Sequence, residues 1–344
     1  MTDVISGLLR NFQNREMNRR QVIQSLALMA TASASGAAQT SSKTFPVTTV
    51  NHLSYAASDY ARIRDFYADL FGMRVVWDDG KGCGIEFGSR SSPNGMFIRS
   101  VAANEKPSIN HVAFGIPNFM AHKAAMKAEM ERRGLKNIRP DGEVGWICDD
   151  PTGYMLNIVP EKDKAVFPGA AAPCAEAASA KCKEAYEAGR KHLDGFHKPS
   201  GRGFKAYAYS HIVLNCSDIP KAREFYINML GMKVIYDQQP DSTKGRSAQV
   251  FLRFGQNTLY LRPAAAGAKS YCNHFAFAVE NYHQDAVEAE LKRRGLDPKP
   301  DSKLAWTITD PDGMRIEVAG WGLPEHIAND CNGANTTCPG GARG

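Results

Sequence analysis

The feature that most constrains the fold of this chain is an internal duplication. The segment SDYARIRDFYADLFGMRVV at residues 58–76 recurs as SDIPKAREFYINMLGMKVI at residues 217–235, an offset of 217 − 58 = 159. His52 and His211 are related by the same offset, and DPTGYMLN at 150–157 recurs as DPDGMRIE at 310–317. Self-similarity at a fixed spacing indicates that one structural unit is built twice.

Each half of the chain divides again. Four short apolar segments begin alike, with NHLSYAA at 51, NHVAFGI at 110, SHIVLNC at 210 and NHFAFAV at 273. Each predicts a strand, and each precedes a helical pattern and then two or three strand-like runs. We therefore predict an α+β fold built from tandem βαβββ modules.

The same pattern sets the expected domain boundaries. We predict a leader at 1–38, a first domain at 49–160, a connector at 161–206, a second domain at 207–320 and a tail at 321–344. The connector is rich in Ala and Lys, with a helix expected near 174–192. The tail is expected to be extended.

The leader has the layout of an export signal. Arg19 and Arg20 precede a short, weakly apolar stretch, which ends in small residues of the kind that a signal peptidase cleaves after. The paired arginines resemble a twin-arginine signal, so we expect the twin-arginine export machinery as a partner and a periplasmic or secreted location. The alternative is an amphipathic N-terminal helix.

Cysteine usage is compatible with export. Four of the eight cysteines lie outside the repeats, namely Cys174, Cys182, Cys331 and Cys338. On a helix, Cys174 and Cys182 would be about 12 Å apart, beyond the ~7 Å that a disulfide spans. We therefore expect disulfides between the connector and the tail, with four free thiols as the alternative.

Charge and hydropathy limit the partners. The chain has 42 basic and 36 acidic residues, a net charge of +6, and the two signs are evenly mixed outside the leader. This pattern does not indicate a nucleic-acid surface. No stretch reaches the ~18 apolar residues of a membrane span, so we expect no membrane-spanning segment.

Three of the four strand histidines, His52, His111 and His274, share their faces with small residues. Strand alternation puts His274 with Cys272, Ala276 and Ala278, and puts the bulky Phe275, Phe277 and Val279 on the opposite face. This pattern predicts that the histidines line a cavity and that the bulky face packs on helices. For Cys272 we favour a small buried thiol over a neighbour of a metal site.

A carboxylate completes a candidate metal site. Glu317 lies in the apolar run MRIEVAG, where an acid costs several kcal/mol unless it is paired or bound to a cation. Together with His211 and His274 it forms a set of two imidazoles and one carboxylate, which suits Fe(II) and also Zn(II) or Mn(II). The alternative is that Glu317 pairs with Arg262 or Arg315 and that the histidines are satisfied locally.

The first copy carries His52, His111 and Asn157 at the matching positions. An amide supplies no negative charge and is a poor ligand for transition metals. We therefore favour a degenerate first site over a second working one.

These residues resemble the vicinal oxygen chelate superfamily, which includes glyoxalases, bleomycin-resistance proteins, fosfomycin-resistance enzymes and type I extradiol dioxygenases. The NH strands and the DPDGMRIE segment carry the resemblance over both copies. It implies two cupped mixed-sheet barrels, and it assigns the metal ligands to His211, His274 and Glu317. A two-domain chain with its metal in the second domain resembles a type I extradiol dioxygenase.

Some features depart from that family. No histidine occurs at 236–273, where the dioxygenases carry an acid–base histidine, and Thr307 stands where they have a tyrosine. Glyoxalases and epimerases use a fourth ligand on a strand that reads NTLYLRP here, without a carboxylate. Tyr260, Arg262 and Arg315 are the candidates for orienting an anionic substrate.

The preferred prediction is an exported enzyme, a dioxygenase-like non-haem protein that binds Fe(II), with Mn(II) or Zn(II) as alternative metals, and acts on a small substrate with vicinal oxygens. A glyoxalase-like lyase or isomerase, or a thiol transferase, is the first alternative. A non-catalytic small-molecule binding or resistance protein is the second. A homodimer is the candidate assembly.

Overall fold

The computed structural model describes residues 43–89, 93–102, 104–142, 145–161, 203–240, 242–244 and 247–328. The leader at 1–38 lies outside these residues, and so do the expected connector helix and the four cysteines for which disulfides were predicted. The other four cysteines, Cys83, Cys148, Cys216 and Cys272, are buried free thiols.

The described chain contains four copies of one strand–helix–three-strand module, which confirms the order predicted from the repeats. The first two modules are β1 Thr49–Ala57, α3 Tyr60–Phe71, β2 Arg74–Asp78, β3 Gly82–Gly88 and β4 Pro93–Ser100, then β5 Ser108–Ile116, α4 Phe119–Arg132, β6 Lys136–Asp141, β7 Gly145–Asp149 and β8 Met155–Pro160. The last two are β9 Ala206–Cys216, α6 Ile219–Asn228, β10 Lys233–Gln238, β11 Gln249–Phe254 and β12 Asn257–Pro263, then β13 Tyr271–Val279, α7 Gln284–Arg293, β14 Lys299–Ser302, β15 Ala305–Thr309 and β16 Arg315–Ala319.

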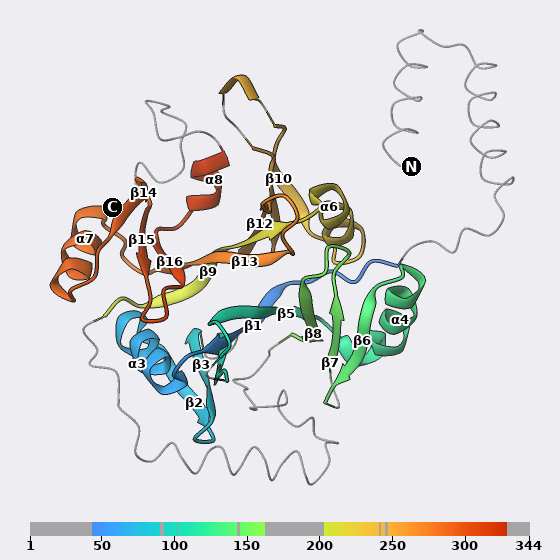
Figure 1. Ribbon diagram of the computed structural model, residues 1–344, viewed down its shortest axis with the longest axis horizontal. Helices are drawn as coiled ribbons and strands as arrows, with labels where there is room; N and C mark the ends of the chain where they lie inside the picture. The colour runs from blue at the N-terminus through green and yellow to red at the C-terminus, as the bar shows by residue number, and fades with distance from the viewer. Residues whose placement is uncertain are drawn as a thin grey trace, which may run out of the picture. The chain divides into compact units, whose positions relative to one another are not determined.

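Each pair of modules forms one mixed eight-stranded sheet (Figure 1). The strand order is β2-β3-β4-β1-β5-β8-β7-β6 in the first sheet and β10-β11-β12-β9-β13-β16-β15-β14 in the second. The central strands β1 and β5 run antiparallel, and so do β9 and β13. The end strands of each sheet, β2 with β6 and β10 with β14, are not neighbours, so the cupped sheets curl but stay open instead of closing into barrels.

Local signals explain where the helices begin and end. The Asp59 carboxylate accepts hydrogen bonds from the backbone N–H groups of Ala61 and Arg62, which caps the start of α3. Gly72 ends the helix with φ at +63°, a left-handed conformation that glycine adopts without strain. Asp218 caps α6 in the same way.

The bulky faces of the strands pack on the helices, as predicted, and they do so across the two sheets. Tyr67 and Phe71 of α3 contact Phe277 of β13, with ring centroids 5.8 and 4.4 Å apart. In the reciprocal position, Tyr226 of α6 contacts Phe114 of β5 at 6.2 Å. The first helix of each domain therefore packs against the central strand of the other domain, and one hydrophobic cluster runs through both.

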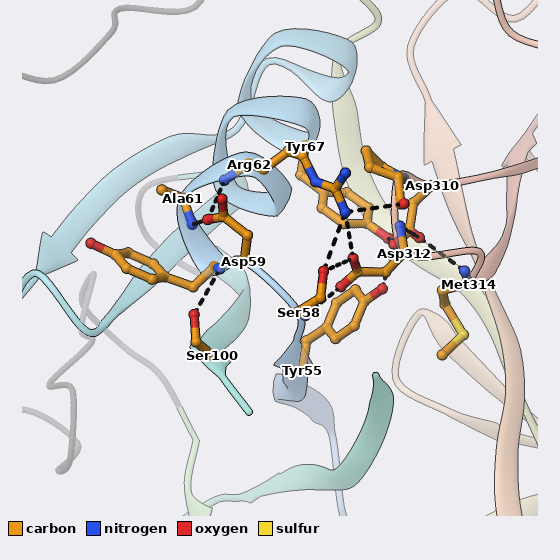
Figure 2. A network of polar contacts seen from close by, with 12 residues as sticks. Tyr55, Ser58, Asp59, Ala61, Arg62, Tyr67, Ser100, Asp310, Asp312 and Met314 are labelled. Carbon is orange, nitrogen blue, oxygen red and sulfur yellow. Dashed lines mark hydrogen bonds and ion pairs between the residues drawn. The ribbon is translucent and has the colours of Figure 1, made fainter. Parts of the chain in front are cut away.

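A buried hydrogen-bond network joins the domains at the same place. Figure 2 shows Asp310 of the second domain facing Tyr55 and Tyr67 of the first, and both hydroxyls donate to its Oδ2, at 2.7 and 2.9 Å. Arg62 and Ser58 bind the carboxylate of Asp312 beside it.

The last described segment differs from its prediction. Leu323–Ala328 form a helix, α8, where an extended tail was expected. Its Leu323 and Ile327 pack against small and aromatic residues on the concave face of the second sheet. Burial of this apolar stripe explains why the segment is helical. Among the described residues, no helix is long and apolar enough to cross a membrane.

Candidate metal centre

The second sheet brings His211 and His274 together from its two central strands. His211 lies on β9 opposite Ala276 of β13, and His274 lies opposite Val213 of β9. The Nε2 atoms of the two histidines are 3.4 Å apart, and each side chain is 1% exposed. The small side chain of Ala276 leaves room between them, as the pattern of small residues predicted.

Glu317 approaches the same point from β16. It is in register with Ala276, so β13 separates it from His211 by one strand on a shared face. Its Oε2 is 3.4 Å from Nε2 of His211, and its Oε1 is 3.2 Å from Nε2 of His274. One ligand atom from each of the three residues lies within 4.8 Å of the others. In the described part of the chain this is the one group of three or more His, Cys, Asp or Glu residues with that property.

Burial keeps both imidazoles neutral. It lowers the pKa of His211 to about 3, although the charge of Glu317 acts in the opposite direction. It also holds the pKa of His274 well below its usual value, with Arg315 and Arg262 adding to the effect. A neutral imidazole has a lone pair to offer, so both residues are in the protonation state that a metal ligand needs.

The hydrogen bonds leave ligand atoms available. Nδ1 of His274 lies 2.7 Å from Oδ1 of Asn273, so that nitrogen carries the proton and Nε2 keeps its lone pair. Within the described residues, Oε2 of Glu317 and Nδ1 of His211 are buried without a hydrogen-bond partner. A carboxylate oxygen in this position is unfavourable unless a cation or an ordered water satisfies it.

Arg315 binds the other carboxylate oxygen. Its Nη2 donates to Oε1 of Glu317 at 2.8 Å and to Oδ1 of Asp301 at 3.0 Å, and Thr307 lies 3.5 Å from the same Oε1. The predicted pairing of Glu317 with an arginine is therefore present together with the triad. Arg315 orients the carboxylate through Oε1 and leaves Oε2 toward His211. Asp301 is a member of this network that the sequence pattern does not reveal.

Tyr260 forms a wall of the site. Its ring lies parallel to that of His211, 4.3 Å between centroids, and 3.7 Å from that of Phe251. Tyr260 is fully buried, and its hydroxyl has no partner among the described residues. Burial and the charge of Glu317 raise its pKa well above the usual value, so this phenol does not ionise near neutral pH.

Arg262 is the unneutralised cation of the site. Its Nε donates to Oε1 of Gln249 at 3.2 Å, and its guanidinium lies 6.0 Å from the centroid of the Tyr260 ring. It makes no ion pair with any described residue. Burial lowers its pKa, and Glu317 opposes that effect. A partly buried cation without a counter-ion attracts an anion.

The position of Cys272 corrects one detail of the strand analysis. A bulge between Cys272 and His274 interrupts the alternation, so Cys272 packs in the shared hydrophobic cluster on the face opposite the histidines. It is a buried thiol, as favoured from the sequence, and burial raises its pKa to about 12.

The first sheet holds the corresponding histidine pair without the acid. Nε2 of His52 lies 3.2 Å from Nε2 of His111, and Asn157 occupies the register position of Glu317. Burial and the charge of Arg139 lower the pKa of His111 to about 4.

Comparison with known proteins agrees with this architecture. The model of the Glyoxalase/Bleomycin resistance protein/Dioxygenase superfamily matches residues 49–158 and 208–318. The uncharacterized protein YwkD of Bacillus subtilis (strain 168) is 28% identical over 126 residues, which are 31% of this chain and 92% of that protein.

Solved structures with the same fold include two dioxygenases. A mutant of homoprotocatechuate 2,3-dioxygenase from Brevibacterium fuscum has a TM-score of 0.58 at 16% identity, covering 81% of this chain and 72% of that one. The 2,3-dioxygenase LapB from Pseudomonas sp. KL28 has a TM-score of 0.59 at 15% identity, covering 81% and 93%. At such identities the likeness establishes a common fold.

Proposed function

Because this chain belongs to the Glyoxalase/Bleomycin resistance protein/Dioxygenase superfamily, we propose that it is a metal-dependent enzyme whose second cup binds one divalent cation. The ligands are Nε2 of His211, Nε2 of His274 and Oε2 of Glu317. The observation that carries the proposal is the buried Oε2, which has no hydrogen-bond partner in the described chain and lies 3.4 Å from Nε2 of the neutral His211.

The donor set narrows the choice of metal. Two imidazole nitrogens and one carboxylate oxygen suit Fe(II), Mn(II) and Zn(II), and three protein ligands leave positions open for substrate. We propose Fe(II) and a dioxygenase-like reaction, which the shared fold with two dioxygenases supports. Such a metal ion acts as a Lewis acid toward two vicinal oxygens of a substrate and, if it is iron, activates O2.

The residues of the cup define what the protein contributes. Arg262 supplies an unpaired positive charge beside the triad, which favours a substrate with an anionic group. Tyr260 and Phe251 close one side with stacked rings and exclude water there. Arg315 and Thr307 hold Glu317 in place.

One feature favours a second candidate. Residues 236–273 contain no histidine, so the strands before His274 supply no imidazole to take a proton from the substrate. A glyoxalase-like lyase or isomerase, or a thiol transferase, makes no use of O2 and is the alternative reaction class. A metal-free binding protein is the third.

The decisive experiment combines metal analysis with oxygen uptake. Full-length protein is purified without added metal, reconstituted anaerobically with Fe(II), and assayed with a panel of catechols that carry acidic or neutral substituents. We expect iron bound in the second cup and O2 consumption, both lost in Glu317→Ala and both kept in Glu280→Ala, which removes an exposed carboxylate. Iron binding without O2 uptake favours the second candidate, and iron retained in Glu317→Ala contradicts the assigned ligands.

We also propose that residues 1–38 direct export through the twin-arginine machinery to the periplasm or beyond. The support is the sequence pattern around Arg19 and Arg20.

A further inference from the structure

The first cup retains a histidine pair with the geometry of the second. His52 of β1 and His111 of β5 are partly buried and meet with Nε2 atoms 3.2 Å apart and rings inclined at 71°. The pair in the second cup has 3.4 Å and 86°. The separation and inclination are therefore preserved, although the acid at the third position is not.

A hydrogen-bond chain assigns the proton on His52. The amide nitrogen of Asn51 donates to the backbone carbonyl of Pro160 at 3.2 Å, so its Oδ1 faces Nδ1 of His52, 3.0 Å away. Since a carbonyl oxygen only accepts, Nδ1 of His52 carries the proton and Nε2 keeps its lone pair. This lone pair is directed toward His111, as the lone pair of His274 is directed toward His211.

Asn157 supplies a second acceptor that lacks a donor. Its Nδ2 donates to Oδ2 of Asp141 at 3.0 Å and to the backbone carbonyl of Trp146 at 3.1 Å. The amide orientation is thereby fixed, and Oδ1 is buried without a hydrogen-bond partner among the described residues. Asn157 is in register with Ala113, as Glu317 is with Ala276, so both side chains point into their cups.

We propose that the first cup is a second metal site, formed by Nε2 of His52, Nε2 of His111 and Oδ1 of Asn157. Two imidazoles select a borderline divalent ion such as Co(II), Ni(II), Cu(II) or Zn(II) over Mg(II) or Ca(II). The amide brings no charge, so this site binds its ion more weakly than the second cup. The Asp141 carboxylate polarises the amide through Nδ2 and increases the electron density on Oδ1. The sequence favoured a degenerate site, because it does not reveal that Oδ1 of Asn157 is buried without a hydrogen-bond partner among the described residues.

The test is a titration of the full-length protein with Co(II), followed by visible absorption and by metal counting after equilibrium dialysis. Wild-type protein is expected to bind two equivalents, one at least tenfold more weakly than the other. His52→Gln/His111→Gln removes the weaker equivalent alone, whereas Glu317→Ala removes the tighter one. His122→Ala, which deletes an exposed histidine of the same domain, keeps both. The tight equivalent retained by the double variant reports that its fold is intact.

A second variant tests the first cup by a gain of metal affinity, which a merely misfolded protein would not show. Asn157→Glu/Met155→Arg reproduces in the first cup the residues found at 317 and 315 in the second. We expect at least tenfold tighter binding of the weaker equivalent. The proposal fails if wild-type protein binds a single equivalent that Glu317→Ala abolishes, or if the weaker equivalent persists in the double histidine variant. In either case the 3.2 Å contact is a hydrogen bond between two neutral imidazoles. This test is independent of the reaction in the second cup, because no substrate is used.

Discussion

The hydroxyl of Tyr67 donates a hydrogen bond to Oδ2 of Asp310 across the domain boundary at 2.9 Å, and Tyr226 makes the equivalent bond to Asp150 at 3.0 Å. The two tyrosines occupy matching positions of the repeat, and so do the two aspartates. Each DP-containing turn therefore receives a tyrosine from the first helix of the other domain. The duplication produces a reciprocal pair of buried contacts that holds the sheets together.

The first prediction concerns the strength of this contact. Tyr67→Phe removes one of the two donors to Oδ2 of Asp310 and should lower the free energy of unfolding by about 1–2 kcal/mol. Asp310→Ala leaves the hydroxyls of Tyr55 and Tyr67 buried without an acceptor and should cost about 3 kcal/mol or more. Urea unfolding of both single variants and of Tyr67→Phe/Asp310→Ala measures the coupling free energy between Tyr67 and Asp310. Tyr226→Phe is the matched control, with a loss within about 1 kcal/mol of that for Tyr67→Phe. If the losses of unfolding free energy in the two single variants simply add in the double variant, the two side chains do not interact.

The second prediction concerns pH. Burial raises the pKa of the Asp310 carboxyl, although the bonds from Tyr55, Tyr67 and the backbone oppose that effect. If folding raises the pKa of a carboxyl, its contribution to stability is fully present below the pKa that it has in the unfolded chain, about 3.9. This contribution is lost as the pH rises through the folded value. Asparagine does not titrate. The difference in unfolding free energy between wild type and Asp310→Asn should therefore shift in favour of the variant between pH 4 and pH 8 in urea unfolding experiments. A shift in favour of the wild type would refute it.

The third prediction concerns Arg262. If its unpaired charge orients an anionic substrate, Arg262→Gln should raise KM for acidic catechols about tenfold or more, because a charge-assisted hydrogen bond is lost. It should leave KM for neutral catechols within about twofold, because they lack the charged group that the guanidinium attracts. Steady-state oxygen uptake with both substrate classes measures the split. Arg293→Gln, at an exposed helix position, is the control. Equal effects on both classes would assign Arg262 a purely structural role.

The fourth prediction concerns the residue that sets the tautomer of His274. Asn273→Ala removes the acceptor for Nδ1–H and should weaken metal binding in the second cup about 10- to 100-fold. Asn273→Asp restores an acceptor and should recover most of the affinity. Competition with a chromogenic chelator provides the measurement. Asn110→Ala is the control. It changes the Asn-His dipeptide of the first domain, where Nδ1 of His111 has no hydrogen-bond partner among the described residues, and it should leave metal affinity in the second cup unchanged.

The fifth prediction concerns export. Replacing Arg19 and Arg20 by lysines should retain the protein in the cytoplasm of a bacterial host with a twin-arginine pathway, because that pathway reads the arginine pair. Cell fractionation and immunoblotting measure the distribution. Arg10→Lys lies outside the pair and should not alter it. Unchanged export of the double lysine variant would exclude the proposed signal.

The sequence by itself determined the modules, their order and the face of the strands that carries the histidines. These features follow from local periodicity, since alternation defines a strand face and the spacing of Ile63, Tyr67 and Leu70 defines a helix stripe. The duplication then supplied the long-range relationship, because it aligned His52 with His211 and Asn157 with Glu317.

Only the tertiary structure decided the features that depend on non-local register and packing. The bulge beside His274 turns Cys272 to the other face, Arg315 of β16 reaches past β15 to Asp301 of β14, and α8 packs on the concave face of the second sheet. The exchange of tyrosine–aspartate bonds between the domains belongs to the same class. In each case the partner lies on a separate element, and the contact energy depends on how sheets and helices settle against one another. A sequence pattern within one strand or one helix does not predict how that element packs against the others.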